Sequence, residues 1–562
     1  MSELTFEVDG KQVTVPDDGA SLLDVLRERL GLRSPKDGCS PQGQCGCCTV
    51  LVDGQPRVAC VTPARRVRGR VVTTLDGLDD DRQRAWAEAF CATGASQCGF
   101  CTPGIVVRLE GLRAKGTDLT DPAKVEQALL AHLCRCTGWR TILDAAARAG
   151  TDAAGAGAEA ATPASGAAGG TGERDLEAAS RRAAIEGRTP QRVAPEVALG
   201  RGGFADDLAP PDALVAVPDG AGGWAVGETL AEARAASGKV QGRRTTVDVI
   251  HPVEPPAGDW DAALRTTWVE PAYLELDASW CRPGGEPATP LANGGAFGGK
   301  QASEVGAVAR RLADEHGRPV RVVLSREDAV RRGPKRPPVA GGVRADGTGV
   351  LRAVRTPGLA EAVASVAPGL AVEEVDVPGP PTSTAIRAAG WAEALVLLAG
   401  AGALVGSGTD APAGDRPPGV LEAAGGEGRG AVRLRSPDGA EARAEVVLGA
   451  DARVAVEVAC GDPLDTIVVR SYCIGAAHMA LGWACSEALA VDADGEVHDL
   501  TIRSFGILRA SDTPPIVVDV APGDGPPVNG SDAVFAAVAA ATWLAQDRPP
   551  AWPTGIRPRE AG

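Results

Sequence analysis

The sequence predicts a multidomain α+β chain in which a small mixed sheet, a helical unit and a long mixed region follow one another. Three observations support this fold class. The chain has 562 residues, more than one hydrophobic core usually holds. Residues 1–78 alternate as strands around one amphipathic stretch, whereas residues 79–150 have helical periodicity. A tract of small residues, 151–173, then separates this N-terminal part from the rest of the chain.

The first unit, residues 1–78, begins with two alternating apolar runs. They flank Asp9-Gly10, a pair typical of hairpin turns. Ser21 can cap a helix that has Asp24 at its third position and leucines along one face. A second hairpin, residues 49–60, turns at Asp53-Gly54. We therefore expect a small mixed sheet with one helix packed across it.

The second unit, residues 79–150, is predicted to be helical. One helix begins at Asp121-Pro122, a cap followed by proline at the first helical position, and another begins at Thr102-Pro103. The tract 151–173 is aperiodic and poor in charge, so it cannot bury enough surface to order itself. We interpret it as a flexible linker whose ends lie about 25–30 Å apart.

The remaining residues mix helices and strands with many Gly and Pro turns. The clearest predictions here are a short helix near 176–188, strands at 320–324 and 444–447, and a helix at 475–488.

Composition excludes several classes of function. The formal net charge is −16, and no basic stripe of the kind that binds nucleic acid is visible. No apolar stretch is long enough to span a membrane, and the N-terminus lacks an apolar signal segment, so we expect a cytoplasmic protein without a membrane anchor. In a reducing compartment, clustering among 14 cysteines indicates metal or redox chemistry rather than disulfides.

The first cysteine group lies in GCSPQGQCGCCTVLVDGQPRVAC. A [2Fe-2S] cluster needs four thiolates that converge from a loop, and the glycines of this loop permit close backbone approach. A tetrahedral zinc site also accepts four thiolates, but the paired Cys-x2-Cys knuckles typical of such sites are missing. Cys47 is either a substitute ligand or a bystander. The candidate ligands are Cys39, Cys45, Cys48 and Cys60.

The second group combines QCGFCTPG with LCRCTGW. Two cysteines separated by one residue lie about 200° apart on a helix, so they can converge only where a helix ends, and Gly138 supports such an end. The helix start after Cys101 would place that thiol beside N-terminal amides, whose dipole favours a thiolate. A second [2Fe-2S] site is therefore predicted at two helix termini. Its candidate ligands are Cys98, Cys101, Cys134 and Cys136.

Together these two motifs resemble the iron-sulfur part of the xanthine oxidase family of molybdenum hydroxylases. The first is similar to plant-type ferredoxins, although five residues rather than four separate Cys39 from Cys45. The resemblance implies a β-grasp ferredoxin-like [2Fe-2S] domain at 1–78 and a helical [2Fe-2S]-binding domain at 79–150. It also implies that Gln97 and Cys98 lie beside a molybdopterin, with electrons running from the helical cluster to the ferredoxin-like cluster.

Fragments beyond the linker resemble the molybdopterin-binding subunit of that family. Residues 200–217 look like the opening of its hammerhead domain, and IGAAHMALGW looks like a helix that lines the pterin. The resemblance implies a remnant hammerhead-like region at 174–280 and a shortened molybdopterin-binding-like region at 281–562. As bland alternatives, a glycine-rich loop can be a simple turn, an arginine can be solvated, and His478 can be an ordinary helix histidine. The implied cofactor contacts, from NGGAFGGK, TSTAIRAAG and the second cysteine group, are Gln97, Gly295, Phe297, Gly298 and Arg387.

The chain also departs from the family pattern. The C-terminal region is about half the family's length, and the family's catalytic base is a glutamate in a Gly-x-Gly-Glu-Pro segment. The corresponding stretch, GDGPPVNGSDAVFAAV, has Pro526 where the glutamate is expected. Its carboxylates are Asp524 and Asp532 alone, and both are displaced, so the catalytic residues stay unassigned. A lost general base typically costs about 10²- to 10⁴-fold in rate.

Two hypotheses follow. The first is a xanthine dehydrogenase/aldehyde oxidase-like enzyme that passes electrons from a molybdopterin centre through two [2Fe-2S] clusters to an external acceptor and acts on a small molecule. The second is an electron-transfer and scaffold subunit whose degenerate molybdopterin domain partners a complete catalytic subunit. A third interpretation, a zinc-stabilised binding protein, would lack the visible absorption of iron-sulfur clusters. Because the chain has no Gly-x-Gly-x-x-Gly fingerprint, the acceptor is expected to be a separate FAD subunit or a soluble carrier. The sequence names neither the substrate nor the oligomeric state.

Overall fold

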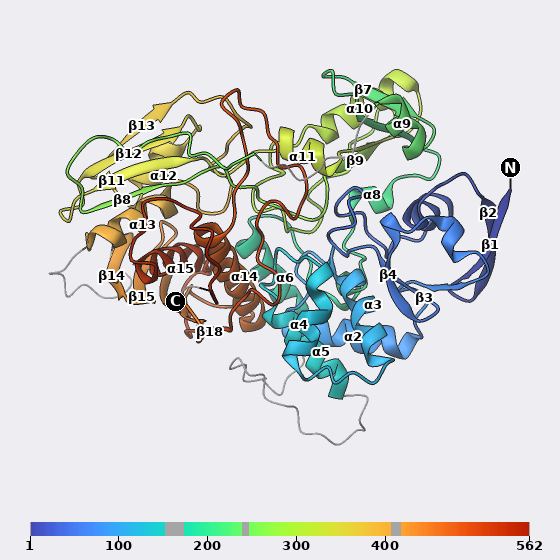
Figure 1. Ribbon diagram of the computed structural model, residues 1–562, viewed down its shortest axis with the longest axis horizontal. Helices are drawn as coiled ribbons and strands as arrows, with labels where there is room; N and C mark the ends of the chain where they lie inside the picture. Colours follow the sequence, from blue (N-terminus) through green and yellow to red (C-terminus); the bar gives the residue numbers. More distant parts are fainter. Residues whose placement is uncertain (1, 152–173, 239–246, 406–416, 561–562) are drawn as a thin grey trace.

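The computed structural model describes residues 2–151, 174–238, 247–405 and 417–560. The predicted linker falls almost wholly outside these ranges. Figure 1 shows the N-terminal sheet at one end, the helices α2–α5 beside it, the paired helices α14 and α15 at the centre, and a second sheet-rich region at the opposite end. The chain is thus a multidomain α+β protein, as predicted.

The N-terminal unit is a five-stranded mixed sheet in the order β2-β1-β5-β3-β4. Its first hairpin turns at Asp9 and Gly10, which both have positive φ, and β1 also pairs in parallel with β5. Ser21 and Asp24 form the predicted capping box, and the helix that follows crosses the sheet. The elements are β1 (Glu3–Val8), β2 (Lys11–Pro16), α1 (Leu22–Asp24), η1 (Val25–Arg29), β3 (Thr49–Val52), β4 (Gln55–Val58), η2 (Ala59–Val61), η3 (Ala64–Val67) and β5 (Val71–Thr73).

Helices follow the sheet and pack directly on it. Gly111 contacts the β3–β4 hairpin so closely that an added Cβ would lie 2.7 Å from Pro56. The Asp121 side chain accepts hydrogen bonds from the first turn of α4, as predicted from the Asp-Pro pair. Sheet and helices share one buried core. These helices are α2 (Asp80–Thr93), α3 (Thr102–Arg113), α4 (Pro122–Ala128), η4 (Leu129–Ala131) and α5 (Arg140–Thr151).

Two four-stranded sheets follow, and the chain crosses from one to the other more than once. One has the order β7-β6-β10-β9 and the other β13-β12-β11-β8. Because β8 precedes β9 in the chain but pairs with β11, segments on both sides of residue 280 contribute to each sheet. The boundary between residues 280 and 281 stays a prediction. The strands are β6 (Leu214–Pro218), β7 (Trp224–Gly227), β8 (Ala262–Arg265), β9 (Ala278–Cys281), β10 (Val320–Val323), β11 (Val339–Val343), β12 (Gly349–Val354) and β13 (Leu370–Val375).

Most of the helices in this part of the chain pack on these two sheets, whereas α6 packs on α14 and α7 on α2. The predicted helix near 176–188 is present as α6, and the predicted strand at 320–324 is present as β10. The helices are α6 (Leu176–Gly187), α7 (Pro195–Ala198), α8 (Ala205–Leu208), α9 (Leu230–Ala236), α10 (Val305–His316), α11 (Arg326–Arg332), α12 (Leu359–Ala364) and α13 (Trp391–Ala401).

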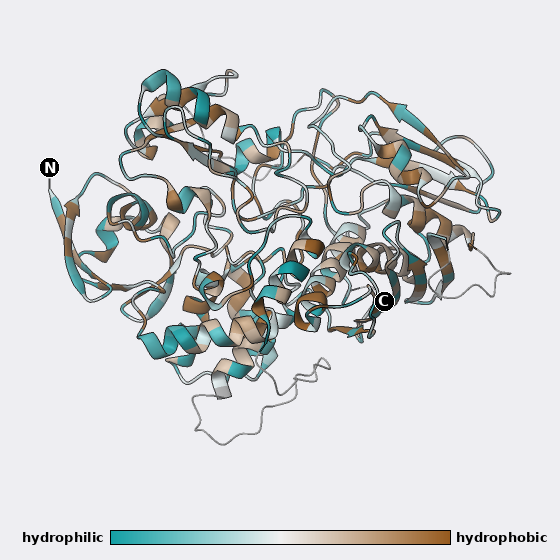
Figure 2. Cartoon of the chain, turned by 180° about the vertical axis from the view of Figure 1, so that it is seen from behind, coloured by the Kyte–Doolittle hydropathy of each residue, from teal (hydrophilic) through white to brown (hydrophobic). Residues whose placement is uncertain are grey.

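The last sheet has five strands in the order β14-β15-β16-β17-β18, and α15 packs across it. Helices α14 and α15 pair with each other and are buried along almost their whole length; in Figure 2 the central helices are mostly white to brown, whereas polar colour gathers on outer helices. The elements are β14 (Gly419–Gly426), β15 (Arg429–Arg435), β16 (Glu441–Val447), β17 (Arg453–Ala459), α14 (Thr466–Cys485), β18 (Ile516–Val520) and α15 (Ser531–Ala545).

Helix α14 begins at Thr466, nine residues before the predicted start at residue 475. The additional residues include β-branched side chains, which weaken helix propensity, but burial in the core outweighs that preference. Asp465 caps the helix by accepting a hydrogen bond from Val468 N. None of the helices in the described ranges is long and apolar enough to cross a membrane.

The C-terminal region encloses the cysteine-bearing units. Trp139 Nε1 donates to Leu508 O at 3.2 Å, and Gln42 Nε2 donates to Leu500 O at 2.9 Å. On the other side, the Arg27 guanidinium lies 2.6 Å from a carboxylate oxygen of Asp206. The N-terminal cysteine groups are therefore buried between two parts of one structure rather than exposed on a separate unit.

His478 anchors this packing and predicts an acid-sensitive stability. It is fully buried on α14, its Nε2 lies 3.0 Å from Leu508 O, and burial lowers its pKa from 6.5 to about 3. Below pH 6.5 this histidine is protonated in the unfolded chain but stays neutral in the folded chain. Its contribution to the free energy of unfolding is therefore fully present above pH 6.5 and is lost as the pH falls toward 3. The expected slope is about 1.4 kcal/mol per pH unit.

A His478→Gln variant tests this expectation, because glutamine keeps a donor but does not titrate. Thermal unfolding between about pH 7.5 and 5.5 should show a flatter acid-side decline in Tm for the variant than for wild type. Parallel declines would contradict a role for His478, and His316→Gln at the end of α10 serves as a control on another helix.

Candidate electron-transfer site

The first thiol set contains the four predicted ligands, all buried, and the thiol of Cys47 is hydrogen-bonded to one of them, Cys45. The Cys39 thiol is hydrogen-bonded to the thiols of Cys45 and Cys60, and the Cys60 thiol is also hydrogen-bonded to that of Cys48. These bonds hold the pKa of Cys39 well below its usual range, which favours a thiolate. Each of the four side chains is at most 5% exposed. The structure therefore brings the four predicted ligands together.

Backbone amides point at sulfur atoms in this set. Gln42 N donates to Cys39 Sγ at 3.2 Å, and Cys60 N donates to Cys48 Sγ at 3.4 Å. A Cβ at Gly38 would lie 3.1 Å from Cys47 Sγ and 3.2 Å from Cys45 Sγ, so glycine lets the backbone approach these sulfurs closely. N–H groups aimed at sulfur and close backbone approach are both features that a [2Fe-2S] site needs.

The extra residue between Cys39 and Cys45 is absorbed in a local turn. Ser40 has φ +54°, the left-handed region, and its N–H is bonded to Asp37 Oδ1 at 2.8 Å. Burial raises the pKa of Asp37 to about 6. The longer loop thus folds back on itself before Gln42 reaches the Cys39 sulfur.

Cys47 lies outside the group of four and is predicted to be a bystander. Its thiol bonds to Cys45, and the charges that act on it include Cys134 of the second set. We expect a Cys47→Ala variant to retain both [2Fe-2S] signals in electron paramagnetic resonance (EPR) after dithionite reduction. Loss of the ferredoxin-like signal in Cys47→Ala, with its retention in a matched Cys460→Ala control, would identify Cys47 as a ligand instead.

The second thiol set consists of two pairs. Cys98 and Cys136 have their sulfurs 3.6 Å apart, and the Cys101 thiol is hydrogen-bonded to that of Cys134. Hydrogen bonds from Cys101 and Thr137 lower the pKa of Cys134 to about 7. Two pairs suit a [2Fe-2S] cluster, in which each iron takes two cysteines.

One half of this set differs from the prediction. Cys101 directly precedes α3, as expected, but Cys134 and Cys136 lie in an irregular loop after η4 ends at Ala131 rather than at a helix end. The loop reverses at Gly138 and Trp139, which both have positive φ. An irregular backbone can turn two thiols separated by one residue to the same side, which a helix cannot.

The arrangement does not suit a single metal ion. In the part of the chain that the structure describes, no group of three or more Cys, His, Asp or Glu side chains is placed to hold one ion. Tetrahedral zinc needs four ligands around one centre. The second set instead has its sulfurs in two pairs, Cys98 with Cys136 and Cys101 with Cys134, which suits a [2Fe-2S] cluster.

A direct contact joins the two thiol sets. Leu133 N, adjacent to Cys134, donates to Cys45 O at 2.9 Å. His132 Nε2 lies 3.1 Å from Thr49 Oγ1, and burial lowers the His132 pKa to about 3, so the imidazole is neutral. Gly104 at the start of α3 packs on the backbone carbonyls of the first loop, where a Cβ would clash. The sets are adjacent, and the space between them is filled by protein.

The predicted glycine-rich loop packs on the second thiol set. Asn293 Nδ2 donates to Cys98 O at 3.1 Å, and a Cβ at Gly295 would lie 3.0 Å from Cys98 Sγ. Gln97 Nε2 donates to Cys136 O at 3.0 Å and to Ser471 Oγ at 2.9 Å. Gln97 and Gly295 therefore touch the two cysteine loops of the second set.

Phe297, Gly298 and Arg387 also meet at this place. Arg387 N donates to Phe297 O at 3.4 Å, and its guanidinium carbon lies 5.2 Å from the Phe297 ring centroid. Gly298 has φ +89° and lies against the Ala385 backbone, which leaves no room for a side chain. The structure thus assembles all five residues that the family resemblance names.

The two carboxylates of the terminal stretch differ sharply. Asp524 is exposed, whereas Asp532 is buried in the first turn of α15, 3.3 Å from the Arg387 guanidinium. Burial raises the pKa of Asp532 although Arg387 and Arg188 oppose the shift. Neither residue stands as a free base: the first is in solvent and the second is paired.

Buried ion pairs that the sequence did not reveal fill the space beside Arg387. Arg135 donates to both oxygens of Glu487, at 2.5 and 2.7 Å, and both side chains are at most 3% exposed. In the sequence, only the position of Arg135 between two cysteines hinted at its importance. Its partner could not be identified, because Glu487 is 352 positions away. The other two pairs are Lys335–Glu270 at 2.9 Å and Arg336–Glu393 at 2.7 Å.

The cavity that these residues line is about 20 Å³, with Phe297, Arg387, Met479 and Trp483 among its walls. That volume admits about one water molecule, whereas cofactor pockets usually measure about 300–1,000 Å³. As folded here, the residues do not fit a molybdopterin. The cysteine sets, by contrast, fit [2Fe-2S] clusters in number, pairing and burial.

Family models match both cysteine-bearing segments. A model described as a 2Fe-2S iron-sulfur cluster binding domain matches residues 6–74, and one described as a [2Fe-2S] binding domain matches residues 74–147. The small FeS subunit of nicotinate dehydrogenase from Eubacterium barkeri is 40% identical over 126 residues, which cover 22% of this chain and 79% of that subunit.

Longer relatives are matched only in part. Xanthine dehydrogenase from Drosophila pseudoobscura pseudoobscura is 40% identical over 157 residues, 25% of this chain but 12% of that protein. Aldehyde oxidoreductase from Desulfovibrio gigas shares the fold along the chain, with a TM-score of 0.66, 16% identity and coverage of 99% of this chain and 98% of that one.

Fold and site together define an iron-sulfur protein with two [2Fe-2S] clusters. The chain belongs to the xanthine oxidase family of molybdenum hydroxylases, whose iron-sulfur part its first 150 residues match.

Proposed function

We propose that this chain conducts electrons from a molybdopterin centre to an external acceptor. The observation that carries the proposal is the pair of thiol sets joined by the hydrogen bond from Leu133 N to Cys45 O. A bound [2Fe-2S] cluster takes up and releases one electron at a time. The family is one of oxidoreductases, which agrees with this role.

The residues of the chain hold, insulate and connect the two centres. Cys39, Cys45, Cys48 and Cys60 are the proposed ligands of one cluster, and Cys98, Cys101, Cys134 and Cys136 of the other. Burial excludes water from both sets, and amides aimed at sulfur stabilise negative charge. The proposal keeps the division into domains at 1–78, 79–150, 174–280 and 281–562, with a linker at 151–173, and a cytoplasmic location.

The surroundings of the two sets support a direction. The second set touches the glycine-rich loop and α14, deep in the structure. In the first set, Cys60 lies in η2 directly before Val61, which is 57% exposed. Electrons are therefore proposed to enter at the second set and to leave at the first, toward a separate FAD subunit or a soluble carrier.

The source of electrons has two candidates. In the first, this chain itself holds the molybdopterin and oxidises a small molecule, with Gln97, Gly295, Phe297, Gly298 and Arg387 as contacts. In the second, the C-terminal region is a scaffold for a separate, complete molybdopterin subunit that binds the substrate. The cavity of about 20 Å³ among buried ion pairs and the proline at position 526 favour the second.

Metal analysis and EPR of the protein purified from its native host test the proposal. We expect two distinct [2Fe-2S] signals after dithionite reduction and iron without molybdenum once partner subunits are removed. A single signal, or bound zinc without iron, would refute the electron relay. Stoichiometric molybdenum in the isolated chain would refute the scaffold role and establish the first candidate.

A further inference from the structure

A run of arginines surrounds the cysteine of the first set that lies nearest to the surface. Between Gln55 and Arg70 the sequence contains five arginines and no acidic residue, and Cys60 lies within this segment. All five side chains are exposed. The whole chain carries a formal charge of −16, so this concentration of positive charge is opposite in sign to the molecule as a whole.

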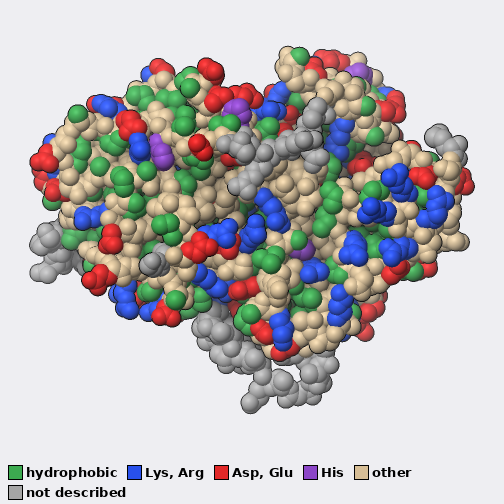
Figure 3. All heavy atoms as spheres, in the orientation of Figure 1, with side chains coloured by type: hydrophobic (Ala, Val, Ile, Leu, Met, Phe, Trp, Pro, Cys, Tyr) green, Lys and Arg blue, Asp and Glu red, His purple; other side chains and the backbone are tan. Residues whose placement is uncertain are grey.

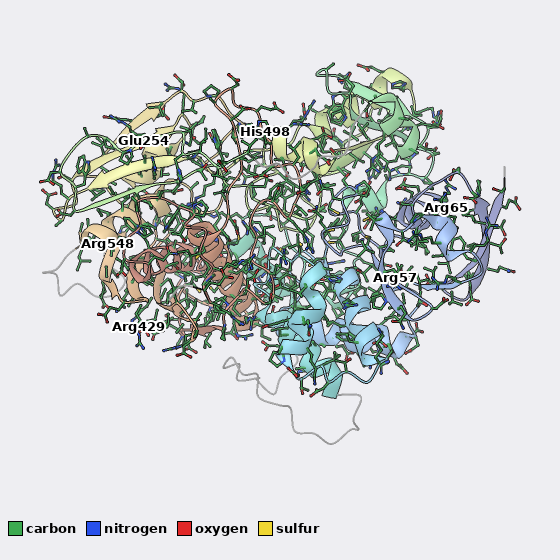
Figure 4. All side chains as sticks on the ribbon, in the orientation of Figure 1. Arg57, Arg65, Glu254, Arg429, His498 and Arg548 are labelled. Carbon is green, nitrogen blue, oxygen red and sulfur yellow. The ribbon has the colours of Figure 1, made fainter. Side chains whose placement is uncertain are left out.

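Among the described residues, three of these arginines have no acidic partner. Arg68 pairs with Asp17 at 3.1 Å and Arg70 with Asp53 at 2.9 Å. Within the described parts of the chain, no ion pair involves the other three. Figure 3 shows Lys and Arg side chains gathered over the N-terminal unit, and Figure 4 places Arg57 and Arg65 on that unit. The three unpaired arginines are Arg57, Arg65 and Arg66.

The same segment lies directly against the first cysteine loop. Cys60 is 5% exposed, but its neighbour Val61 in η2 is 57% exposed. A Cβ at Gly43, in the loop between Cys39 and Cys45, would lie 2.8 Å from Val61 Cγ1. The exposed Val61 side chain therefore packs on this loop, whose residues 41–44 are themselves half-buried. Val71, which is 42% exposed, is a second exposed apolar residue on this unit.

An exposed apolar residue among unpaired like charges is the surface expected for a brief electron-transfer encounter. Such interfaces are small, and complementary charge on the partner speeds association without requiring high affinity. Unpaired arginines offer the attraction, since paired ones are already neutralised locally. A bulky anchor pocket, which would suit a permanent complex, is not needed for this role.

We propose that the surface formed by Val61, Arg57, Arg65 and Arg66 is the electron exit and docks a small redox protein with an acidic face. This inference rests on the proposed electron relay and adds its exit surface and the charge of its acceptor. The reaction at the surface is a one-electron transfer: the reduced cluster is oxidised, and the acceptor is reduced by the same electron.

Reoxidation of dithionite-reduced protein by small ions tests the local charge. Each molecule of ferricyanide, an anion, removes one electron, as does tris(phenanthroline)cobalt(III), a cation. If electrons leave beside the arginines, ferricyanide should react fastest at low salt and slow down as salt is added, because screening weakens attraction. If the net charge of −16 governs, the ferricyanide rate should instead rise with salt, which would overturn the proposal.

The variant Arg57→Gln/Arg65→Gln/Arg66→Gln sharpens the test. We expect it to reduce the low-salt ferricyanide rate by on the order of tenfold and to remove the salt dependence. The cationic acceptor should oxidise the triple variant at least as fast as it oxidises the wild type. Arg429→Gln/Arg453→Gln, at two exposed arginines on the distant β14–β18 sheet, is the matched control and should change neither rate.

A protein acceptor provides the second arm. A strongly acidic flavodoxin should reoxidise the reduced wild-type protein faster than the reduced triple variant. High salt should abolish this difference. Equal rates at low salt would overturn the docking surface. EPR signals and iron content measured on each variant keep the two claims apart: intact clusters with unchanged rates refute the exit surface alone, whereas missing clusters in wild type refute the relay.

Discussion

Replacing Cys136 by alanine is expected to abolish one of the two [2Fe-2S] signals and to leave about half of the iron. Cys136 has its sulfur 3.6 Å from that of Cys98, and the pair supplies two of the four thiols in the second set. Alanine removes one ligand without adding bulk. The first set has its own sulfurs and its own amide donors, so its signal should persist.

The measurements are iron content and EPR of the dithionite-reduced variant. Cys98→Ala should give the same result, and the double variant should be no worse, because each single change already empties the pair. Cys473→Ala, a buried thiol on α14 outside both sets, is the control and should keep both signals. Two intact signals in Cys136→Ala would show that the second cluster does not need this thiol.

Local patterns predicted the parts of the site that are local in the chain. The capping box of Ser21 and Asp24, the turn at Asp9-Gly10 and the start of α3 after Cys101 each depend on residues a few positions apart. The cysteine motifs are local in the same sense, because the ligands come in short groups at 39–48, 98–101 and 134–136, with Cys60 apart. Such short-range features could be predicted from spacing, whereas the meeting of the groups depends on packing.

Distant packing determined what the sequence could not show. Gln97 contacts Ser471, and Arg387 meets Asp532, through contacts that no spacing rule predicts. The early start of α14 and the irregular loop at Cys134 also follow from burial rather than from propensity. The family resemblance gave no cavity size, because that depends on how side chains from several segments meet.

The buried pair between Arg135 and Glu487 shows most clearly how the two halves depend on each other. Arg135 stands between Cys134 and Cys136, whereas Glu487 follows the end of α14. A Cβ at Gly482 would contact the Glu487 carboxylate, so the helix end is shaped around this side chain. The pair therefore joins the second thiol set to the centre of the C-terminal region.

Glu487→Ala is accordingly expected to lower the stability of the transition that unfolds α14 by about 3–5 kcal/mol, because it leaves the Arg135 guanidinium buried without its partner. The double variant Arg135→Met/Glu487→Leu removes both charges and should recover most of the loss. Thermal and chemical unfolding measure these differences, and an exposed pair, Arg84 with Asp81, supplies the control: Asp81→Ala should leave stability nearly unchanged. EPR adds a readout that stability alone does not give, since loss of Glu487 should alter the signal of the second cluster and spare the first. If Glu487→Ala were no less stable than Asp81→Ala, the ion pair would not join the thiol set to α14.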